Sequence, residues 1–384
     1  MRDGWIETTL DGIADVVMGQ SPDGKSYNQE GKGLPFMQGS AEFGEHNPIP
    51  EKWCSDPKKI AEPGDLLLSV RAPVGDTNFA DQRIAVGRGL SIIRANKESL
   101  TQFIRLVIQL NVAELIASSG SGMFASITGK NLKEFKVNLP PLPEQKRIVD
   151  LISSVDSYIE ALQKQLKSAK KSRNAVLHEL LTAGGEDWVS TTIGDISEFV
   201  SVRKSPEELS SNSIYVGLEH LEPNNTSIDN FDSVGKVTSS LTPFDVGDVL
   251  FGRLRPYLHK VAIAKMFGFC SPEILVLRAN SKVLPQMLLL FCDADSTIRI
   301  CVERSAGTRM PRTSTEDLAS IEIKLPSIVE QIKLAELSST FDTDISHLGI
   351  ALEKSKILRS GLLSDLLNGT HAIPASYDRV IGAA

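Results

Sequence analysis

The chain has 384 residues, of which 41% are hydrophobic and 23% charged, and it carries a net charge of -7 at pH 7. This length is too great for one ordinary hydrophobic core and predicts two domains with connecting helices. The composition is typical of a globular protein. The acidic balance disfavours a free-standing nucleic-acid binder, which is usually basic.

The sequence contains no apolar run of the roughly 18 residues that a membrane-spanning helix needs, and the opening MRDGWIETTL does not have the pattern of a signal peptide. The cysteines form no CxxC pair and no metal-ligand spacing; they are Cys54, Cys270, Cys292 and Cys301. We therefore expect reduced thiols in a cytoplasmic protein.

Taken in chain order, the two halves begin alike, with WIETTLDGIADVVMG at residues 5–19 and WVSTTIGDISEFVS at residues 188–201. Each predicts a short strand or helix at the start of a domain core. The following stretches, 20–60 and 202–240, are rich in Gly, Pro, Asn and Ser and predict loops and short strands.

Similarity between the halves then returns. A Gly-Asp turn precedes an apolar strand in each half. In chain order, the matched elements are strands 64–68 and 247–251, strands 90–94 and 274–278, and helices 101–117 and 283–304.

Each half next contains a loop of small and polar residues, at 120–132 and 305–318, before its last strand. Such a loop is rich in hydrogen-bond donors and is unlike a core segment. It is either part of a binding surface or an ordinary connection to the strand that follows.

A long helix is predicted from about Leu139 to Leu181, after the proline-rich entry LPPLPEQ. Pro143 lies in its first turn, where proline is tolerated, and Gly184-Gly185 ends it. Apolar or small residues recur in steps of four and three, which is the heptad pattern of a helix facing another helix. They are Val155, Ile159, Leu162, Leu166, Ala169, Val176 and Leu180, interrupted by Arg173.

This helix has a second copy at an offset of 186 (331 minus 145), where Leu325-Pro326 and Glu330-Gln331 repeat its entry. The seam arginine recurs as Arg359. The matching seam positions are Phe341, Ile345, Leu348, Leu352, Ser355, Leu362 and Leu366. The chain is therefore an internal duplication.

Catalytic motifs are missing from the sequence. Asn47-Pro48-Ile49-Pro50 lacks the adjacent prolines and the aromatic residue of an amino-methyltransferase motif, and no Walker A loop occurs. Glu322-Ile323-Lys324 resembles half of a nuclease motif but has no suitably placed aspartate upstream. The six histidines form no HExxH motif. We therefore predict that the chain alone is not an enzyme.

The duplicated architecture resembles the specificity (S) subunit of Type I restriction-modification systems. The residues that carry the resemblance are Trp5 and Trp188, Gly64-Asp65 and Gly247-Asp248, residues 139–145, Leu325-Pro326 and Glu330-Gln331. The second helix entry departs from the pattern, since Ser327-Ile328-Val329 replaces Pro141-Leu142-Pro143.

The resemblance implies an α+β fold with two globular α/β target-recognition domains, separated by two long antiparallel helices and related by a pseudo-two-fold duplication. The expected domains are residues 1–140 and 184–325, the spacer helices 141–183 and 326–369, and a tail 370–384.

In function, the resemblance implies a non-catalytic subunit that reads a bipartite, asymmetric sequence in double-stranded DNA. The expected partners are two methyltransferase (M) subunits, together with restriction endonuclease (R) subunits in systems that carry them. No cofactor is expected on this chain, and S-adenosylmethionine is expected on the methyltransferase. A helix of roughly 40 residues is about 60 Å long, which limits the half-site separation to somewhat under two turns of DNA.

Partner subunits that enclose the duplex would reconcile DNA recognition with an acidic chain, because only local basic groups are then needed. Arginine can bind guanine O6 and N7 or hold phosphates; a solvated surface charge is the alternative for each residue. The DNA-binding candidates are Arg71, Arg88 and Lys130 in the first domain, and Arg253, Arg255, Arg309 and Arg312 in the second.

Apolar residues off the narrow seam widen the apolar face of the helices beyond what a two-helix contact needs. They predict partner-binding positions, and these are Leu151, Ile152, Leu177, Leu181, Leu337 and Leu363. Arg173 and Arg359 are predicted to set the helix register.

Two other functions compete with this interpretation. A coiled-coil scaffold with protein-binding ends predicts no DNA affinity with or without a methyltransferase. A self-sufficient modification enzyme predicts cofactor binding by this chain alone, and the missing motifs argue against it.

Overall fold

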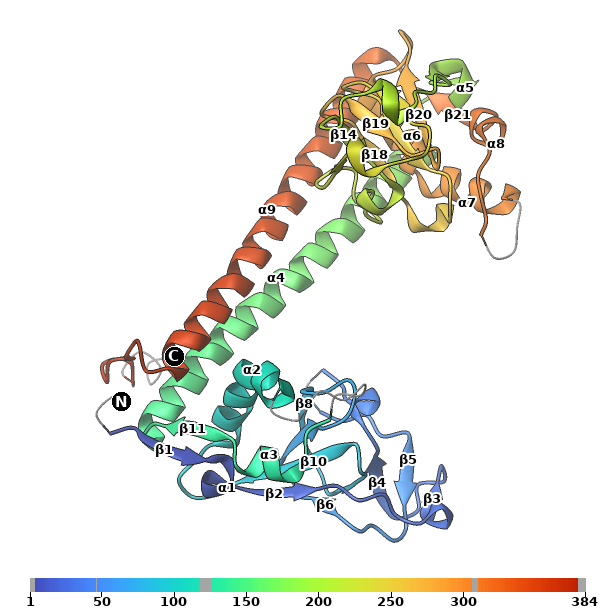
Figure 1. Cartoon of the computed structure of the whole chain (residues 1–384). Coiled ribbons are helices and arrows are strands. Elements are labelled where there is room, and N and C mark those ends of the chain that lie inside the picture. The colour runs from blue at the N-terminus through green and yellow to red at the C-terminus, as the bar shows by residue number, and fades with distance from the viewer. Residues whose placement is uncertain (1–3, 46, 118–125, 306–309, 379–384) are drawn as a thin grey trace. The chain divides into compact units, whose positions relative to one another are not determined.

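The computed structural model describes residues 4–45, 47–117, 126–305 and 310–378. It divides into two compact units, Met1–Gln163 with Ala351–Ala384, and Lys164–Ile350. Each unit holds one globular domain and half of each long helix, α4 (Leu142–Ala183) and α9 (Ile328–Leu367) (Figure 1). Helix and sheet are mixed in both units, as the predicted α+β class requires.

The first domain begins with β1 (Ile6–Thr9), which pairs antiparallel with the last strand, β11 (Lys136–Leu139). A four-stranded antiparallel sheet has the order β2 (Ala14–Met18), β10 (Leu90–Ala95), β7 (Leu66–Ser69), β8 (Thr77–Phe79). A second sheet has the order β3 (Tyr27–Asn28), β5 (Lys52–Cys54), β4 (Leu34–Met37), β9 (Ile84–Val86), β6 (Ile60–Ala61). The helices are α1 (Leu10–Ile13), α2 (Thr101–Ala117) and α3 (Gly129–Lys133).

The second domain repeats this topology except that, in the part of the chain that the structure describes, its second sheet has no counterpart of β3. Its strands β12 (Val189–Thr192) and β21 (Glu322–Leu325) pair as β1 and β11 do. The sheets have the orders β13 (Ser197–Phe199), β20 (Ile274–Ala279), β17 (Val249–Gly252), β18 (Val261–Ile263), and β15 (Asp232–Ser233), β14 (Ile214–Val216), β19 (Gly268–Cys270), β16 (Thr242–Phe244). The helices are α5 (Ile193–Ile196), α6 (Pro285–Asp293), α7 (Asp295–Arg304) and α8 (Thr315–Ala319).

The helical segment after the central sheet differs from the prediction. The single helix expected over residues 283–304 is wrong, because Ala294 has extended dihedrals (φ -61°, ψ 137°) and separates α6 from α7. Asp295 then stands in the first turn of α7, where a carboxylate is favoured by the helix dipole. The expected helix at 101–117 is present as α2, with non-helical dihedrals at Asn111.

The Gly-Asp turns have the same geometry in both domains. Gly64 and Gly247 both have φ of +91°, a left-handed conformation that favours glycine. Asp65 accepts hydrogen bonds from Arg94 at 2.9 and 2.6 Å, and Asp248 accepts the matching pair from Arg278 at 2.9 and 2.7 Å. Each turn is therefore held to the neighbouring strand by a bidentate ion pair, which is a strong and directional contact.

The Glu-Gln motif at each helix entry has a structural explanation in its glutamine. Gln145 is fully buried; its oxygen accepts from Leu100 N at 2.9 Å and its amide donates to Glu98 O and Pro140 O. Gln331 makes the corresponding three bonds with Leu284 N, Lys282 O and Pro326 O. These bonds satisfy backbone groups that burial would otherwise leave unpaired.

The start of α9, which lacks the prolines found at the start of α4, is stabilised by hydrogen bonds between Ser327 and Glu330. Ser327 Oγ accepts from Glu330 N at 3.4 Å, and Glu330 Oε2 accepts from Ser327 N at 3.3 Å. This reciprocal arrangement is a capping box, which satisfies the free N–H groups at a helix start.

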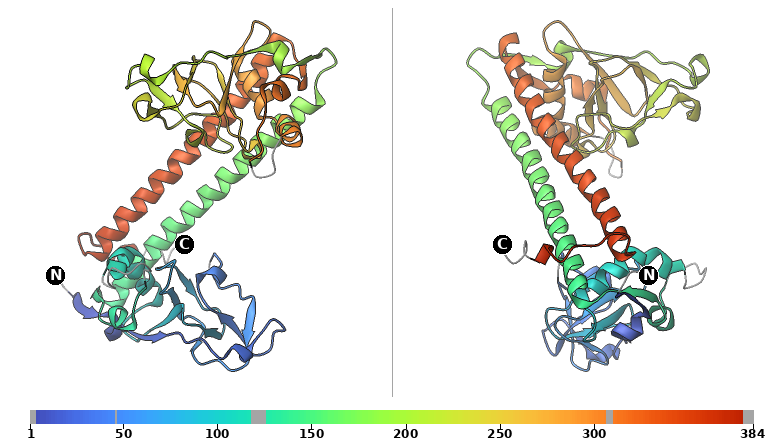
Figure 2. Two further views of the ribbon diagram at one scale, coloured as in Figure 1. Left: turned by 45° about the vertical axis from the view of Figure 1, so that its right-hand side comes forward. Right: turned by 90° about the vertical axis from the view of Figure 1, so that its left-hand side faces the viewer.

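The two long helices are uninterrupted (Figure 2), and the predicted seam is confirmed. Every seam position is buried or half-buried except Leu180, which is 37% exposed. Arg173 Nε donates to Asp342 Oδ1 at 2.6 Å in one unit, and Arg359 Nη2 donates to Asp156 Oδ2 at 3.0 Å in the other. Asp156 and Asp342 are themselves related by the offset of 186 (342 minus 156), so the two ion pairs are reciprocal.

These pairs join the last part of α4 to the first part of α9, and the last part of α9 to the first part of α4. The helices therefore run antiparallel within each unit.

The C-terminal tail is part of the first unit. Ile373 is buried in its core, Tyr377 packs against that core, and Arg147 Nε lies 2.8 Å from Asp378 Oδ1. Across the described segments, no helix combines the length and apolar character needed to cross a bilayer, and no cluster of His, Cys, Asp or Glu side chains could hold a metal ion.

Candidate nucleic-acid interface

Two loops meet in the first domain, one after β7 and one before α3. Arg71 forms an isolated β-bridge with Ser126, and Ile127 N donates to Val70 O at 2.9 Å. The Arg71 side chain is exposed and makes no ion pair with any residue that the structure describes. This pair of loops, 70–76 and 126–128, is the first loop cluster.

The second domain brings together the equivalent loops, one after β17 and one before α8. Leu254 forms a β-bridge with Arg312, Thr313 N donates to Arg253 O at 3.0 Å, and Arg255 N donates to Pro311 O at 2.9 Å. The structure therefore gathers three predicted residues, Arg253, Arg255 and Arg312, in the second loop cluster, made of 253–259 and 311–313.

The three arginines are held differently. Arg253 is half-buried and its Nε donates to Thr313 O at 3.2 Å, so it fastens one loop to the other. Arg312 Nη2 lies 2.8 Å from Glu273 Oε1, which neutralises part of its charge. Arg255 is exposed, has no ion pair with another described residue, and is the side chain most available to an anionic ligand.

The remaining predicted residues lie elsewhere. Lys130 is on α3 with its side chain 80% exposed and only a 3.9 Å contact to Glu134. Arg309 lies outside the described residues. Arg88 follows β9 and lines a hollow of about 990 Å³ rather than the first loop cluster.

The hollow at Arg88 contains side chains that sequence reasoning missed. Gln38 Oε1 accepts from Ser21 Oγ at 3.2 Å, and Lys52 and Tyr27 line the same hollow. Burial raises the pKa of Tyr27, and its hydroxyl donates to Pro22 O at 3.1 Å. Amide, hydroxyl and cationic groups of this kind suit base edges and phosphates. These residues fall in the loop-rich stretch 20–60, where the sequence has no periodic signal.

Tyr257 was also missed. It is 52% exposed between Arg255 and His259, and sequence alone could have marked it as an aromatic residue in the Arg-Pro turn.

The six predicted partner-binding residues divide by burial. Ile152 and Leu363 are buried in the core of the first unit, Leu177 is buried in that of the second, and Leu151 and Leu181 pack against those cores. The cores of the two domains therefore cover the wider apolar face of the helices, which had suggested a partner helix. Leu337 is 37% exposed and remains a candidate for partner binding.

The fold defines a class of protein in which two copies of one α+β domain each carry an equivalent loop cluster with an exposed arginine and share two antiparallel helices. Family comparison assigns the chain within this class. Residues 2–171 and 185–353 match the Type I restriction modification DNA specificity domain, and the chain belongs to that family.

Relatives agree with this assignment. The chain is 41% identical over 168 residues to a putative type I restriction enzyme MjaX specificity subunit of Methanocaldococcus jannaschii, a match that spans 44% of this chain and 40% of that protein. It is 21% identical over 360 residues to the type I restriction enzyme EcoDI specificity subunit of Escherichia coli, spanning 83% of this chain and 79% of that one.

The solved structure of a Type-I restriction-modification system S subunit from M. genitalium shares the fold, with a TM-score of 0.57 and 17% identity over 94% of this chain and 96% of that one. The resemblance read from the sequence is confirmed. The relatives are specificity subunits, which supports a role in DNA sequence specificity and does not favour the scaffold interpretation.

Proposed function

We propose that this chain reads a bipartite, asymmetric sequence in double-stranded DNA, one half with each domain, and positions adenine methyltransferase subunits on it. The observation that carries the proposal is the repeated loop cluster. Equivalent loops meet in both domains through the same backbone contacts, while their exposed side chains differ, as expected for one fold that reads two sequences.

The acidic net charge is compatible with this function if partner subunits supply most of the phosphate contacts. Phosphate contacts provide much of the affinity of a DNA-binding complex, whereas a few base contacts provide its specificity. The exposed cations Arg71 and Arg255 are candidates for the base contacts that provide specificity. S-adenosylmethionine then belongs to the methyltransferase, and the complex works in the cytoplasm.

The outer surfaces of α9 support docking of two methyltransferase subunits. Ile350, Ile357 and Leu358 are 51%, 72% and 64% exposed, and Ile350 and Ile357 are one heptad apart. Large apolar side chains exposed in succession along a helix commonly mark a protein-binding surface. A restriction endonuclease subunit would join the same assembly in a system that encodes one.

The test is to co-express the chain with the methyltransferase encoded beside it, in a host that lacks adenine methylation, and to map modified adenines by long-read sequencing. We expect a split motif with a fixed gap, lost when the chain is omitted. Replacing the second domain with that of a relative should change only one half of the motif. A stable complex that leaves DNA unmodified would contradict the proposal and favour the scaffold.

Single substitutions then assign the halves. Arg255→Ala should weaken binding of the complex roughly 5- to 150-fold through lost contacts at one half-site, because a good bidentate arginine–base contact contributes about 1–3 kcal/mol. Arg71→Ala should act on the other half. The matched control is Arg83→Ala, an exposed arginine paired with Glu62 outside both clusters. Equal losses for all three variants would show that only net charge matters.

A further inference from the structure

The loop between β17 and β18, residues 253–259, has an unusual backbone. Arg255 (φ 52°) and His259 (φ 49°) are both left-handed and flank the short 3-10 helix Pro256–Leu258. Left-handed conformations are uncommon for residues other than glycine, asparagine and aspartate, and persist only where the surroundings hold them. Arg255 itself is exposed, and so is Tyr257, which lies between the two left-handed residues. We call residues 253–259 the recognition loop.

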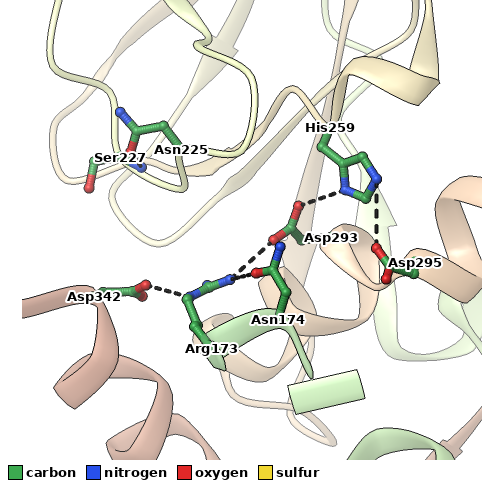
Figure 3. A network of polar contacts seen from close by, with 8 residues as sticks. All are labelled: Arg173, Asn174, Asn225, Ser227, His259, Asp293, Asp295 and Asp342. Atoms are coloured by element: carbon green, nitrogen blue, oxygen red, sulfur yellow. Dashed lines mark hydrogen bonds and ion pairs between the residues drawn. The ribbon is translucent and has the colours of Figure 1, made fainter. Parts of the chain in front are cut away.

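Both ends of the recognition loop are held. At its start, Arg253 N donates to Glu273 O at 2.9 Å. At its end, the His259 ring lies between two carboxylates, with Nδ1 3.5 Å from Asp293 Oδ1 and Nε2 3.7 Å from Asp295 Oδ1 (Figure 3). Only the Asp293 contact is well shielded, because the Asp293 side chain is 13% exposed and that of Asp295 is 60% exposed.

The Asp293 carboxylate also faces the spacer helix. Its Oδ2 lies 3.6 Å from Arg173 Nη1, and Arg173 is only 6% exposed. Arg173 in turn binds Asp342 of α9 and Asn174 of its own helix (Figure 3). A single, largely shielded carboxylate thus connects His259 of the recognition loop with Arg173 of α4.

The first domain has a different group at the matching place. There the seam arginine, Arg359, donates from Nη2 to Gln109 Oε1 of α2 at 3.5 Å, in place of the contact with the carboxylate of Asp293. Gln109 and Asp293 are equivalent by the offset of 184 that also relates Leu100 to Leu284 (284 minus 100, 293 minus 109). No hydrogen bond is found between Gln109 and the loop after β7 within the described part of that domain, so the connection belongs to the second domain.

We propose that Asp293 is a positioning residue for half-site recognition: by binding His259 and Arg173 with one carboxylate, it fixes the recognition loop, and with it Arg255 and Tyr257, to spacer helix α4. The proposal rests on the proposed function and assigns the second domain a device that the first lacks. Ion pairs that are largely shielded from solvent restrict a loop more than exposed ion pairs do.

The connection depends on the charge of His259. A hydrogen bond with Asp293 raises the pKa of His259 above its ordinary value, burial works in the opposite direction, and the negative charges of Asp293 and Asp295 add to the increase. The charged groups around the ring are Asp293 of α6 and Asp295 of α7, with Arg173 of α4 behind Asp293. Because the pKa is raised in the folded state, the anchoring is fully present below about pH 6.5 and is lost as pH rises through the folded-state pKa.

The experiment uses the purified complex of the full chain with its methyltransferase and three duplexes. One carries the complete motif, one has the first half-site scrambled, and one has the second half-site scrambled. The affinity ratio of complete to scrambled duplex gives the discrimination at each half-site, measured at pH 6.5 and pH 8.5.

The two test variants are Asp293→Asn, which removes the shared charge, and His259→Asn, which keeps a residue that tolerates left-handed dihedrals but removes the imidazole. The control variants are Gln109→Ala, at the equivalent place in the first domain, and His178→Gln, a histidine of α4 that lines the same small cavity as Asp293 and Asp295.

The wild-type complex should lose discrimination at the second half-site, and not at the first, between pH 6.5 and pH 8.5. Both test variants should lower second half-site discrimination roughly tenfold at pH 6.5 and remove its pH dependence, while both controls behave as wild type. If Asp293→Asn unfolds, His259→Asn decides, because it leaves the contacts of Arg173 with Asp342 and Asp293 in place.

Wild-type discrimination in a folded His259→Asn complex would overturn the inference, and so would an equal loss at both half-sites, since that marks a general structural role. A wild-type complex that discriminates at neither half-site would instead refute the proposed function.

Discussion

The two seam arginines occupy equivalent places in the two repeats but have different surroundings. Arg173 has a side chain 8% exposed and lies between two carboxylates, Asp342 and Asp293. The Arg359 side chain is 24% exposed, and its one carboxylate partner among the described residues is Asp156. Burial lowers the pKa of the half-buried Arg105 of α2, and the positive charge of Arg359 adds to this decrease. The Arg173 side chain is therefore more buried and has more ionic partners than that of Arg359.

This difference shows how a duplicated protein can specialise. The contacts that build each domain, such as those of the buried glutamines and the Gly-Asp turns, are kept in both copies. The ion pair between Asp293 and Arg173, which joins the second domain to α4, has no ionic counterpart in the described part of the first domain, where Gln109 stands in place of Asp293. Both domains pack apolar side chains of the long helices into their cores, such as Ile152 in the first and Leu177 in the second, and the second domain adds the ion pair of Asp293 with Arg173.

The largest expected effect is on stability at the seam. Arg173→Ala removes the cation from Asp342 and one of the two cationic neighbours of Asp293, and should destabilise the second unit by about 3 kcal/mol. Arg359→Ala should cost the first unit roughly 1 to 2 kcal/mol, because its partner is partly solvated. Calorimetry of each variant, with the transitions assigned to the two units, measures both values. Equal losses would contradict the comparison.

The buried glutamines should behave alike in the two units. Gln145→Ala and Gln331→Ala each leave three backbone groups without their partner, and each should destabilise its unit by about 2 to 3 kcal/mol. Urea unfolding followed by a probe in each domain would measure the pair. A difference above about 1 kcal/mol between them would show that the duplication is less symmetric than the hydrogen bonds indicate.

The entry tryptophans provide a finer test. Trp5 Nε1 donates to Glu144 at 3.1 Å, whereas Trp188 Nε1 is buried with no hydrogen-bond partner among the described residues. Trp5→Phe should therefore cost about 1 kcal/mol, and Trp188→Phe should be neutral or slightly stabilising. Thermal melts of the two variants measure this. A clear loss for Trp188→Phe would mean that its N–H has a partner in solution.

The smallest effect is the pH dependence of stability. Because the pKa of His259 is raised in the folded state, the second unit should lose stability as pH rises from 6 to 9, and His259→Asn should remove this loss. The melting temperature of wild type and variant across that range is the measurement. An unchanged pH profile in His259→Asn would assign the dependence to another group.

Much of this architecture could be predicted from the sequence, because repeats and hydrophobic periodicity can be recognised without knowing which segments meet in space. The offset of 186 predicted two equivalent long helices, and the steps of four and three predicted which face is buried, since these spacings follow directly from helix geometry. The proline-rich entry with Glu-Gln predicted the family. The recurrence of one arginine in the seam predicted a role in register, although not its partners.

Tertiary structure alone decided which groups meet. Arg71 with Ser126, Arg253 with Thr313, and the three groups His259, Asp293 and Arg173 are far apart in sequence and come together only when strands and helices pack. The sequence predicted Ile152, Leu177 and Leu363 as partner-binding residues, whereas the structure buries them in the domain cores. Hydrophobic spacing indicates that a helix face is covered, but it does not indicate which segment covers it.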